Sequence, residues 1–170
     1  MRLPIIISAG LLLSFGLNLP VMSKSPVEIA QAQSPASNNW NLRRSQRRLE
    51  FNRRFWSGQN ISNYEYTLSN SCFCIADARG PVVIKVRNGQ TISVTSVATG
   101  KPVNPEFFQS YNTIPKLFDV IQDAISRKAF SLNVEYSARF GYPTKINIDY
   151  DSQIADEEKY LTIENFKVIK

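Results

Sequence analysis

The chain has 170 residues and a mass of 19.3 kDa, a length that suits a single domain. It contains no histidine, which excludes every mechanism that uses an imidazole as a base, a proton shuttle or a metal ligand. Its two cysteines are too few for a four-thiolate zinc or iron–sulfur site within one chain.

Residues 1–32 have the pattern of a secretory signal peptide. A lone basic residue, Arg2, precedes an uncharged apolar run that Pro20 ends. Ala30-Gln31-Ala32 then offers the small residues that signal peptidase accepts. We therefore expect cleavage before Gln33 and export to the periplasm or the extracellular space.

Two alternatives to this cleavage remain open. One is an earlier cut after Ser23. The other is a retained membrane anchor, because Pro4–Met22 is about as long as the roughly 20 residues that a membrane span requires. Polar residues within the run favour cleavage, so no integral membrane span is expected after processing.

The next two segments differ in pattern. Residues 33–39 are polar and include one proline, so we expect a flexible lead-in. Residues 40–58 are predicted to form a basic amphipathic helix, because Leu42, Leu49 and Trp56 repeat every seven residues and line one stripe.

The net positive charge is concentrated in this predicted helix. Residues 33–170 contain 18 basic and 13 acidic residues, a net charge of +5, and residues 33–60 carry the same +5 alone. Residues 61–170 contain 12 of each and are neutral. The basic side chains of the helix are Arg43, Arg44, Arg47, Arg48, Arg53 and Arg54.

Alternation of apolar and polar residues predicts six strands, three on each side of a second helix. Thr113 is a suitable N-cap for that helix, in which apolar residues from Ile114 to Ala129 fall at helical spacing. Asn88-Gly89 predicts a hairpin with a type I′ turn between the second and third strands. The predicted strands are centred on residues 64–68, 82–86, 91–95, 132–136, 146–150 and 161–168.

The order of these elements is α-βββ-α-βββ. It predicts a single α+β domain over residues 60–170, with an antiparallel sheet of about six strands and helices packed on one face. Gly141-Tyr142-Pro143 and the polar residues 151–159 are expected to be connecting turns.

Several short motifs occur together in this region: Tyr64-x-Tyr66, Ser71-Cys72-Phe73-Cys74, Gly80-Pro81-Val82, Val86-Arg87-Asn88-Gly89, Thr113-Ile114, Leu117-Phe118, Gly141-Tyr142-Pro143-Thr144, Ile148-Asp149 and Asp156-Glu157-Glu158. Their combination resembles a family of secreted bacterial domains, the domain of unknown function 6174, over roughly residues 60–168. The resemblance implies no catalytic residues, because the family has no established activity. The arginine-rich helix lies largely outside the region of resemblance.

Cys72 and Cys74 are a candidate disulfide or redox site. Neighbouring thiols tend to pair in the oxidising compartment that an exported protein meets. Residues two apart in a straight strand have Cα atoms about 6.5–7 Å apart, the upper limit for a disulfide, so a bond requires the strand to bend or end there. A local structural disulfide, free thiols, and a redox or soft-metal site are the three alternatives.

The six arginines are candidate residues for binding an anionic surface. The simplest interpretation is a solvated helix face whose apolar stripe packs on the sheet. Clustered arginines with flanking aromatic residues also suit anionic lipid or acidic polysaccharide. Nucleic acid is not expected as a partner, because export separates the protein from it.

We expect no cofactor and no metal site. The acidic stretch that begins at Asp149 fails the spacing of a calcium-binding EF-hand loop. With Asp149 in the first position, Ile154 occupies the glycine position and Tyr160 the position of the bidentate glutamate.

These observations predict an exported binding or interaction domain that is not an enzyme and that works through one sheet face or its loops. Its partner is expected to be an unknown protein, or an anionic surface bound through the basic helix. The alternative is a thiol–disulfide or soft-metal handling protein that uses Cys72 and Cys74.

Export itself gives the first testable prediction. Mass spectrometry of the protein recovered outside the cytoplasm is expected to show a chain that begins at Gln33. An intact, soluble chain in the cytosol would contradict export.

Overall fold

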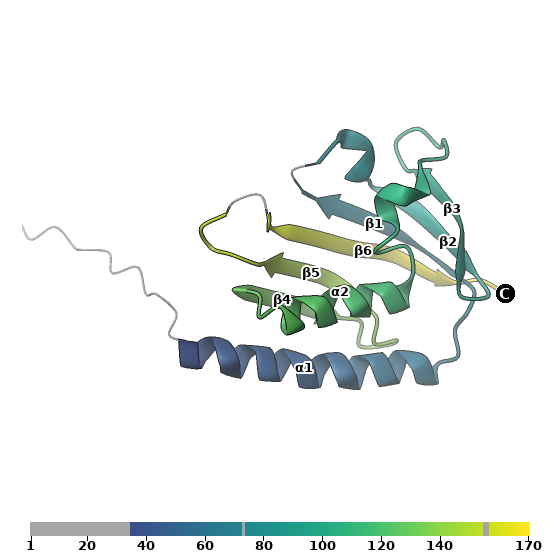
Figure 1. Cartoon of the computed structure of the whole chain (residues 1–170). Coiled ribbons are helices and arrows are strands. Elements are labelled where there is room, and N and C mark those ends of the chain that lie inside the picture. The colour runs from purple at the N-terminus through teal and green to yellow at the C-terminus, as the bar shows by residue number, and fades with distance from the viewer. Residues whose placement is uncertain (1–34, 73, 155–156) are drawn as a thin grey trace, which may run out of the picture. The chain divides into compact units, whose positions relative to one another are not determined.

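The computed structural model describes residues 35–72, 74–154 and 157–170, all within one unit, Gln33–Lys170. The expected signal peptide and residues 33–34 lie outside the described residues. The helices and strands are α1 (Pro35–Gly58), β1 (Tyr64–Ser71), β2 (Val82–Arg87), β3 (Gln90–Ser96), α2 (Ile114–Ser126), β4 (Ser131–Tyr136), β5 (Pro143–Asp149) and β6 (Lys159–Val168), with short 3-10 helices η1 (Ala76–Ala78) and η2 (Pro105–Phe108). The predicted α+β class and element order are confirmed (Figure 1).

The six strands form one antiparallel sheet in the order β3-β2-β1-β6-β5-β4. Each half of the chain contributes three consecutive strands, and the first strand of one half pairs with the last strand of the other. In that central pairing Leu68 on β1 lies opposite Ile163 on β6. The sheet is therefore complete only when the last strand of the chain has joined the first.

Helix α1 begins at Pro35 rather than at residue 40. Residues 35–39 thus continue the helix, although their polar composition had favoured a flexible lead-in. No helix within the described ranges is long and apolar enough to cross a membrane.

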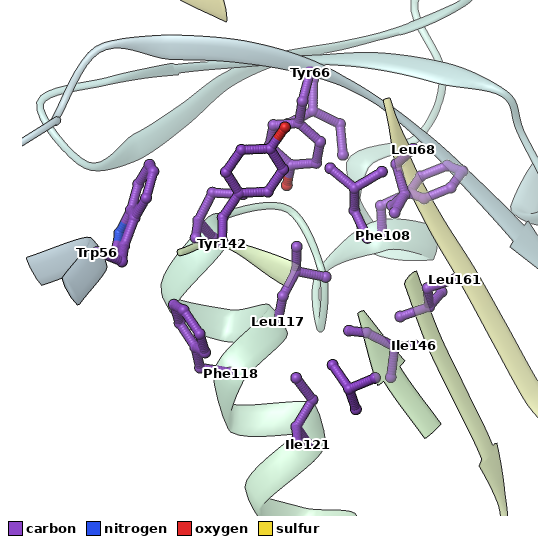
Figure 2. Packing of buried hydrophobic residues seen from close by; sticks show 14 of the residues in the cluster. Trp56, Tyr66, Leu68, Phe108, Leu117, Phe118, Ile121, Tyr142, Ile146 and Leu161 are labelled. Carbon is purple, nitrogen blue, oxygen red and sulfur yellow. The ribbon is translucent and has the colours of Figure 1, made fainter. Parts of the chain in front are cut away.

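Helix α2 covers the sheet, and α1 contacts both α2 and the edge strand β4 (Figure 1). The Thr113 hydroxyl caps α2 by accepting the N–H of Lys116, as predicted. The apolar side of α2 packs against strand residues such as Ile146 and Leu161 (Figure 2). Its buried residues are Ile114, Leu117, Phe118, Ile121 and Ala124.

Two tyrosines of β1 attach the segment that leads into α2. The backbone N–H of Ile114 donates to the Tyr64 hydroxyl at 3.0 Å, and the Tyr66 hydroxyl donates to the Tyr111 carbonyl at 2.7 Å. Burial raises the pKa of Tyr64 to about 12 and the pKa of Tyr66 well above its ordinary value. Both phenols therefore stay uncharged in the core, where an ionised hydroxyl would be costly.

Aromatic rings hold the C-terminal half of α1. The Trp56 indole lies edge-on to Tyr64, Tyr142 and Phe166, with ring centroids 5.5, 6.2 and 5.6 Å away. Such edge-to-face pairs stabilise beyond the area they bury. Gly141 has a positive φ, and a Cβ there would come within 3.0 Å of the Asn52 carbonyl on α1. A glycine is thus required for the turn between β4 and β5 to approach the helix.

Two predicted turns have different outcomes. Asn88 and Gly89 both have positive φ values, 49° and 74°, and the hairpin between β2 and β3 forms as predicted. Pro143 was expected in a turn but begins β5 and pairs with Tyr136. A proline is compatible with the first residue of a strand because no ladder bond from its nitrogen is needed there.

Replacing Tyr66 with phenylalanine is expected to lower the free energy of unfolding by about 1–3 kcal/mol, because the carbonyl of the half-buried Tyr111 loses its donor. Urea denaturation measures this loss. The control is Tyr160→Phe, at a residue that is 40% exposed, and its effect should stay within about 0.5 kcal/mol. Equal effects of the two substitutions would show that the Tyr66 hydroxyl is not a structural link.

Candidate functional site

The six arginines of α1 do not form one surface. Arg48 turns back onto the domain, where its guanidinium donates to the Val134 carbonyl on β4 at 3.0 Å and lies 5.4 Å from the centre of the Tyr136 ring. Arg53 pairs with Asp119 on α2 at 2.9 Å and lies 5.7 Å from the centre of the Phe118 ring. These two side chains connect α1 to its neighbours.

The other four arginines, Arg43, Arg44, Arg47 and Arg54, are exposed. Among the residues that the structure describes, none of the four makes an ion pair. The acidic residue of α1, Glu50, accepts a hydrogen bond from Gln46 through its side chain. Four guanidinium groups are therefore available to solvent.

An aromatic side chain lies among these charges. Phe51 is 65% exposed, a large fraction for a side chain of this size. At 100° per residue, Arg43, Arg47, Phe51 and Arg54 fall within an arc of about 80°. We call these four residues the α1 outer face. Phe55 lies beside it, 38% exposed, with its ring centre 6.3 Å from that of Phe51.

The sheet face away from α2 is polar. Ser69, Thr162, Lys145 and Glu135 lie side by side across four strands. Further along, Glu65 lies within 4 Å of two lysine ammonium groups. Because the residues paired across these strands are polar or charged, the use of this face as a docking surface has less support than that of the α1 outer face.

A cavity of about 460 Å³ lies beside α2 and contains Lys159. Burial lowers the pKa of this half-buried lysine, and its ammonium lies 5.5 Å from the centre of the Tyr111 ring. The carboxylates of the cavity are already engaged, since Asp119 pairs with Arg53 and Asp123 accepts from the Tyr150 hydroxyl. Sequence reasoning missed Lys159, which stands at the start of a strand with no motif around it.

Cys72 and Cys74 form a disulfide, with Cα atoms 5.3 Å apart. Strand β1 ends at Ser71, so the chain bends there as the predicted bond requires. The loop that follows is hydrogen-bonded to the buried Asn70. The Asn70 amide donates to Cys72 Sγ at 3.2 Å and to the Ala78 carbonyl at 3.3 Å. Such contacts favour a structural disulfide.

No set of three His, Cys, Asp or Glu side chains that is suited to holding a metal ion occurs within residues 35–72, 74–154 and 157–170. Of the acidic stretch, Asp156 lies outside these ranges. The soft-metal alternative relied on two thiols, and both sulfurs are joined in the disulfide.

Comparison with known proteins gives one match. No curated protein and no solved structure matches the chain. The profile of a family of unknown function matches residues 48–168. The match begins inside α1, earlier than the expected start near residue 60, and so includes Leu49 and Trp56, which belong to the core. The chain therefore belongs to DUF6174, a family of unknown function.

Proposed function

We propose that this protein is an exported, non-catalytic domain that binds an anionic membrane surface through the α1 outer face. The observation that carries the proposal is the exposure of Phe51 among three arginines that have no acidic partner among the described residues. Basic residues around an exposed aromatic ring suit the boundary between lipid headgroups and acyl chains.

The charge distribution supports an orientation in which α1 faces the membrane. Residues 33–60 carry a net charge of +5, whereas residues 61–170 are neutral. A domain with its excess charge on one helix turns that helix toward a negatively charged surface as it approaches. The side of α1 that faces the core is held by Leu49 and Trp56, so the arginines reach a membrane without any rearrangement of the fold.

The triple substitution of Arg43, Arg47 and Arg54 with glutamine tests the proposal. Each basic group near an anionic membrane contributes about 1 kcal/mol. The triple variant is therefore expected to bind vesicles of phosphatidylglycerol and phosphatidylcholine roughly 100-fold more weakly at low salt. Co-sedimentation measures the partition coefficient, and wild-type binding should fall as salt is raised.

A matched control removes three exposed charges elsewhere, by Arg87→Gln, Lys101→Gln and Lys145→Gln. This control has the same net charge but should bind nearly as well as the wild type. Absent or salt-independent binding of the wild type would contradict the proposal. Retention on an acidic polysaccharide without vesicle binding would assign the surface to a different partner.

The thiol–disulfide alternative has its own test. We expect mass spectrometry with and without reduction and alkylation to find Cys72 and Cys74 fully oxidised in the exported protein and unchanged by glutathione. Replacing both with serine should cost roughly 1–2 kcal/mol at most, because so short a loop loses little chain entropy on closure. Vesicle binding should be unaffected. Ready exchange with glutathione would instead favour a thiol–disulfide exchange function.

A further inference from the structure

A cavity of about 170 Å³ lies between the N-terminal half of α1 and the start of β4. Its polar lining comes from Asn41, Arg44, Ser45 and Arg48 on the helix and from Ser131 on the strand. This arginine cavity, as we call it, is distinct from the α1 outer face, because none of the four residues of that face lines it.

The arginine cavity has a one-sided charge. Its lining contains two guanidinium groups and no carboxylate. At the C-terminal end of the adjoining helix α2, three carbonyl groups already accept backbone N–H groups: Asp123 from Arg127, Ile125 from Lys128 and Ala124 from Ala129. The electrostatic potential inside therefore favours an anion.

Arg48 is already held in place for binding. Its guanidinium is fixed by the hydrogen bond to the Val134 carbonyl and by the ring of Tyr136. Because an arginine has five N–H donors, this single bond leaves most of them free. A fixed, planar guanidinium binds the oxygens of a phosphate in pairs, and less side-chain freedom is lost on binding.

We propose that the arginine cavity binds one phosphate group between Arg44 and Arg48, with hydroxyl donors from Ser45 and Ser131. The phosphate comes from a lipid headgroup or is free in solution. A lipid headgroup as the ligand rests on the proposed function. It would add a specific contact to the general attraction between the basic helix and an anionic membrane. The cavity itself does not depend on membrane binding.

The test adds a carboxylate to the cavity by Ser131→Asp, which engages the guanidinium groups and repels an anion. Asn133→Asp is the matched control, since it adds the same charge to an exposed residue two positions along the same strand. Titration of the full chain with inorganic phosphate at constant ionic strength should show saturable binding that is about tenfold weaker or more in Ser131→Asp. Asn133→Asp should resemble the wild type, and Arg44→Gln should reproduce the loss.

The two sources are separated by phosphatidylglycerol vesicles. A larger loss of vesicle binding in Ser131→Asp than in Asn133→Asp supports a headgroup phosphate. Equal vesicle binding together with weakened binding of inorganic phosphate supports the cavity with free phosphate as its ligand. If the two variants behave alike in both experiments, the proposal is overturned.

The triple variant of the α1 outer face provides the final distinction. It should bind inorganic phosphate within about twofold of the wild type, because its three arginines do not line the cavity. If the wild type binds inorganic phosphate but does not bind vesicles, the proposed function is refuted and the phosphate site in the cavity is supported.

Discussion

The packing of Trp56 determines which side of α1 reaches solvent. Its indole meets rings from β1, from the turn before β5 and from β6, so the helix cannot rotate about its axis without separating several aromatic contacts. Leu49, two turns earlier, is buried on the same side. Phe51 is rotated by about 140° from Trp56 at helical spacing, which leaves it on the solvent side. The exposure of the α1 outer face is thus a consequence of the core.

The position of α1 depends in turn on α2, and the position of α2 depends on the tyrosines of β1. The Tyr64 and Tyr66 hydroxyls attach the backbone just before and at the first turn of α2. With its N-terminal end fixed, α2 presents Asp119 to Arg53 and Phe118 to the same guanidinium. Exposed ion pairs of this kind contribute little to stability, so the ion pair selects the alignment of the two helices more than it strengthens their contact.

Much of the fold was predictable from the sequence because its signals are local. The Thr113 cap and the Asn88-Gly89 turn each depend on residues that are neighbours in the chain. Alternation of apolar and polar residues likewise predicted the strands, and β1 indeed buries every second residue. Residues 35–39 differ from the prediction because serine and asparagine favour caps and turns, whereas in the structure they continue without a break into the helix that ends at Gly58.

The division of the arginines was not predictable in the same way. Arg47 and Arg48 are neighbours with the same chemistry and both are exposed, yet the Arg48 guanidinium bonds to a carbonyl 86 residues away along the chain. Only the placement of β4 beside α1 decides this. The need for glycine at position 141 also comes from a long-range contact, because the atoms that exclude a Cβ belong to α1.

The same bond from Arg48 occupies the Val134 carbonyl on the edge strand β4, and part of the opposite edge is occupied as well. Along β3, the Val103 N–H donates to the Val94 carbonyl and the Ser96 N–H to the Lys101 carbonyl. Open edges are where separate copies of a β protein add strand to strand and grow into aggregates. By occupying hydrogen-bonding groups at both ends of its sheet, this small domain leaves fewer free backbone groups for edge-to-edge pairing between copies.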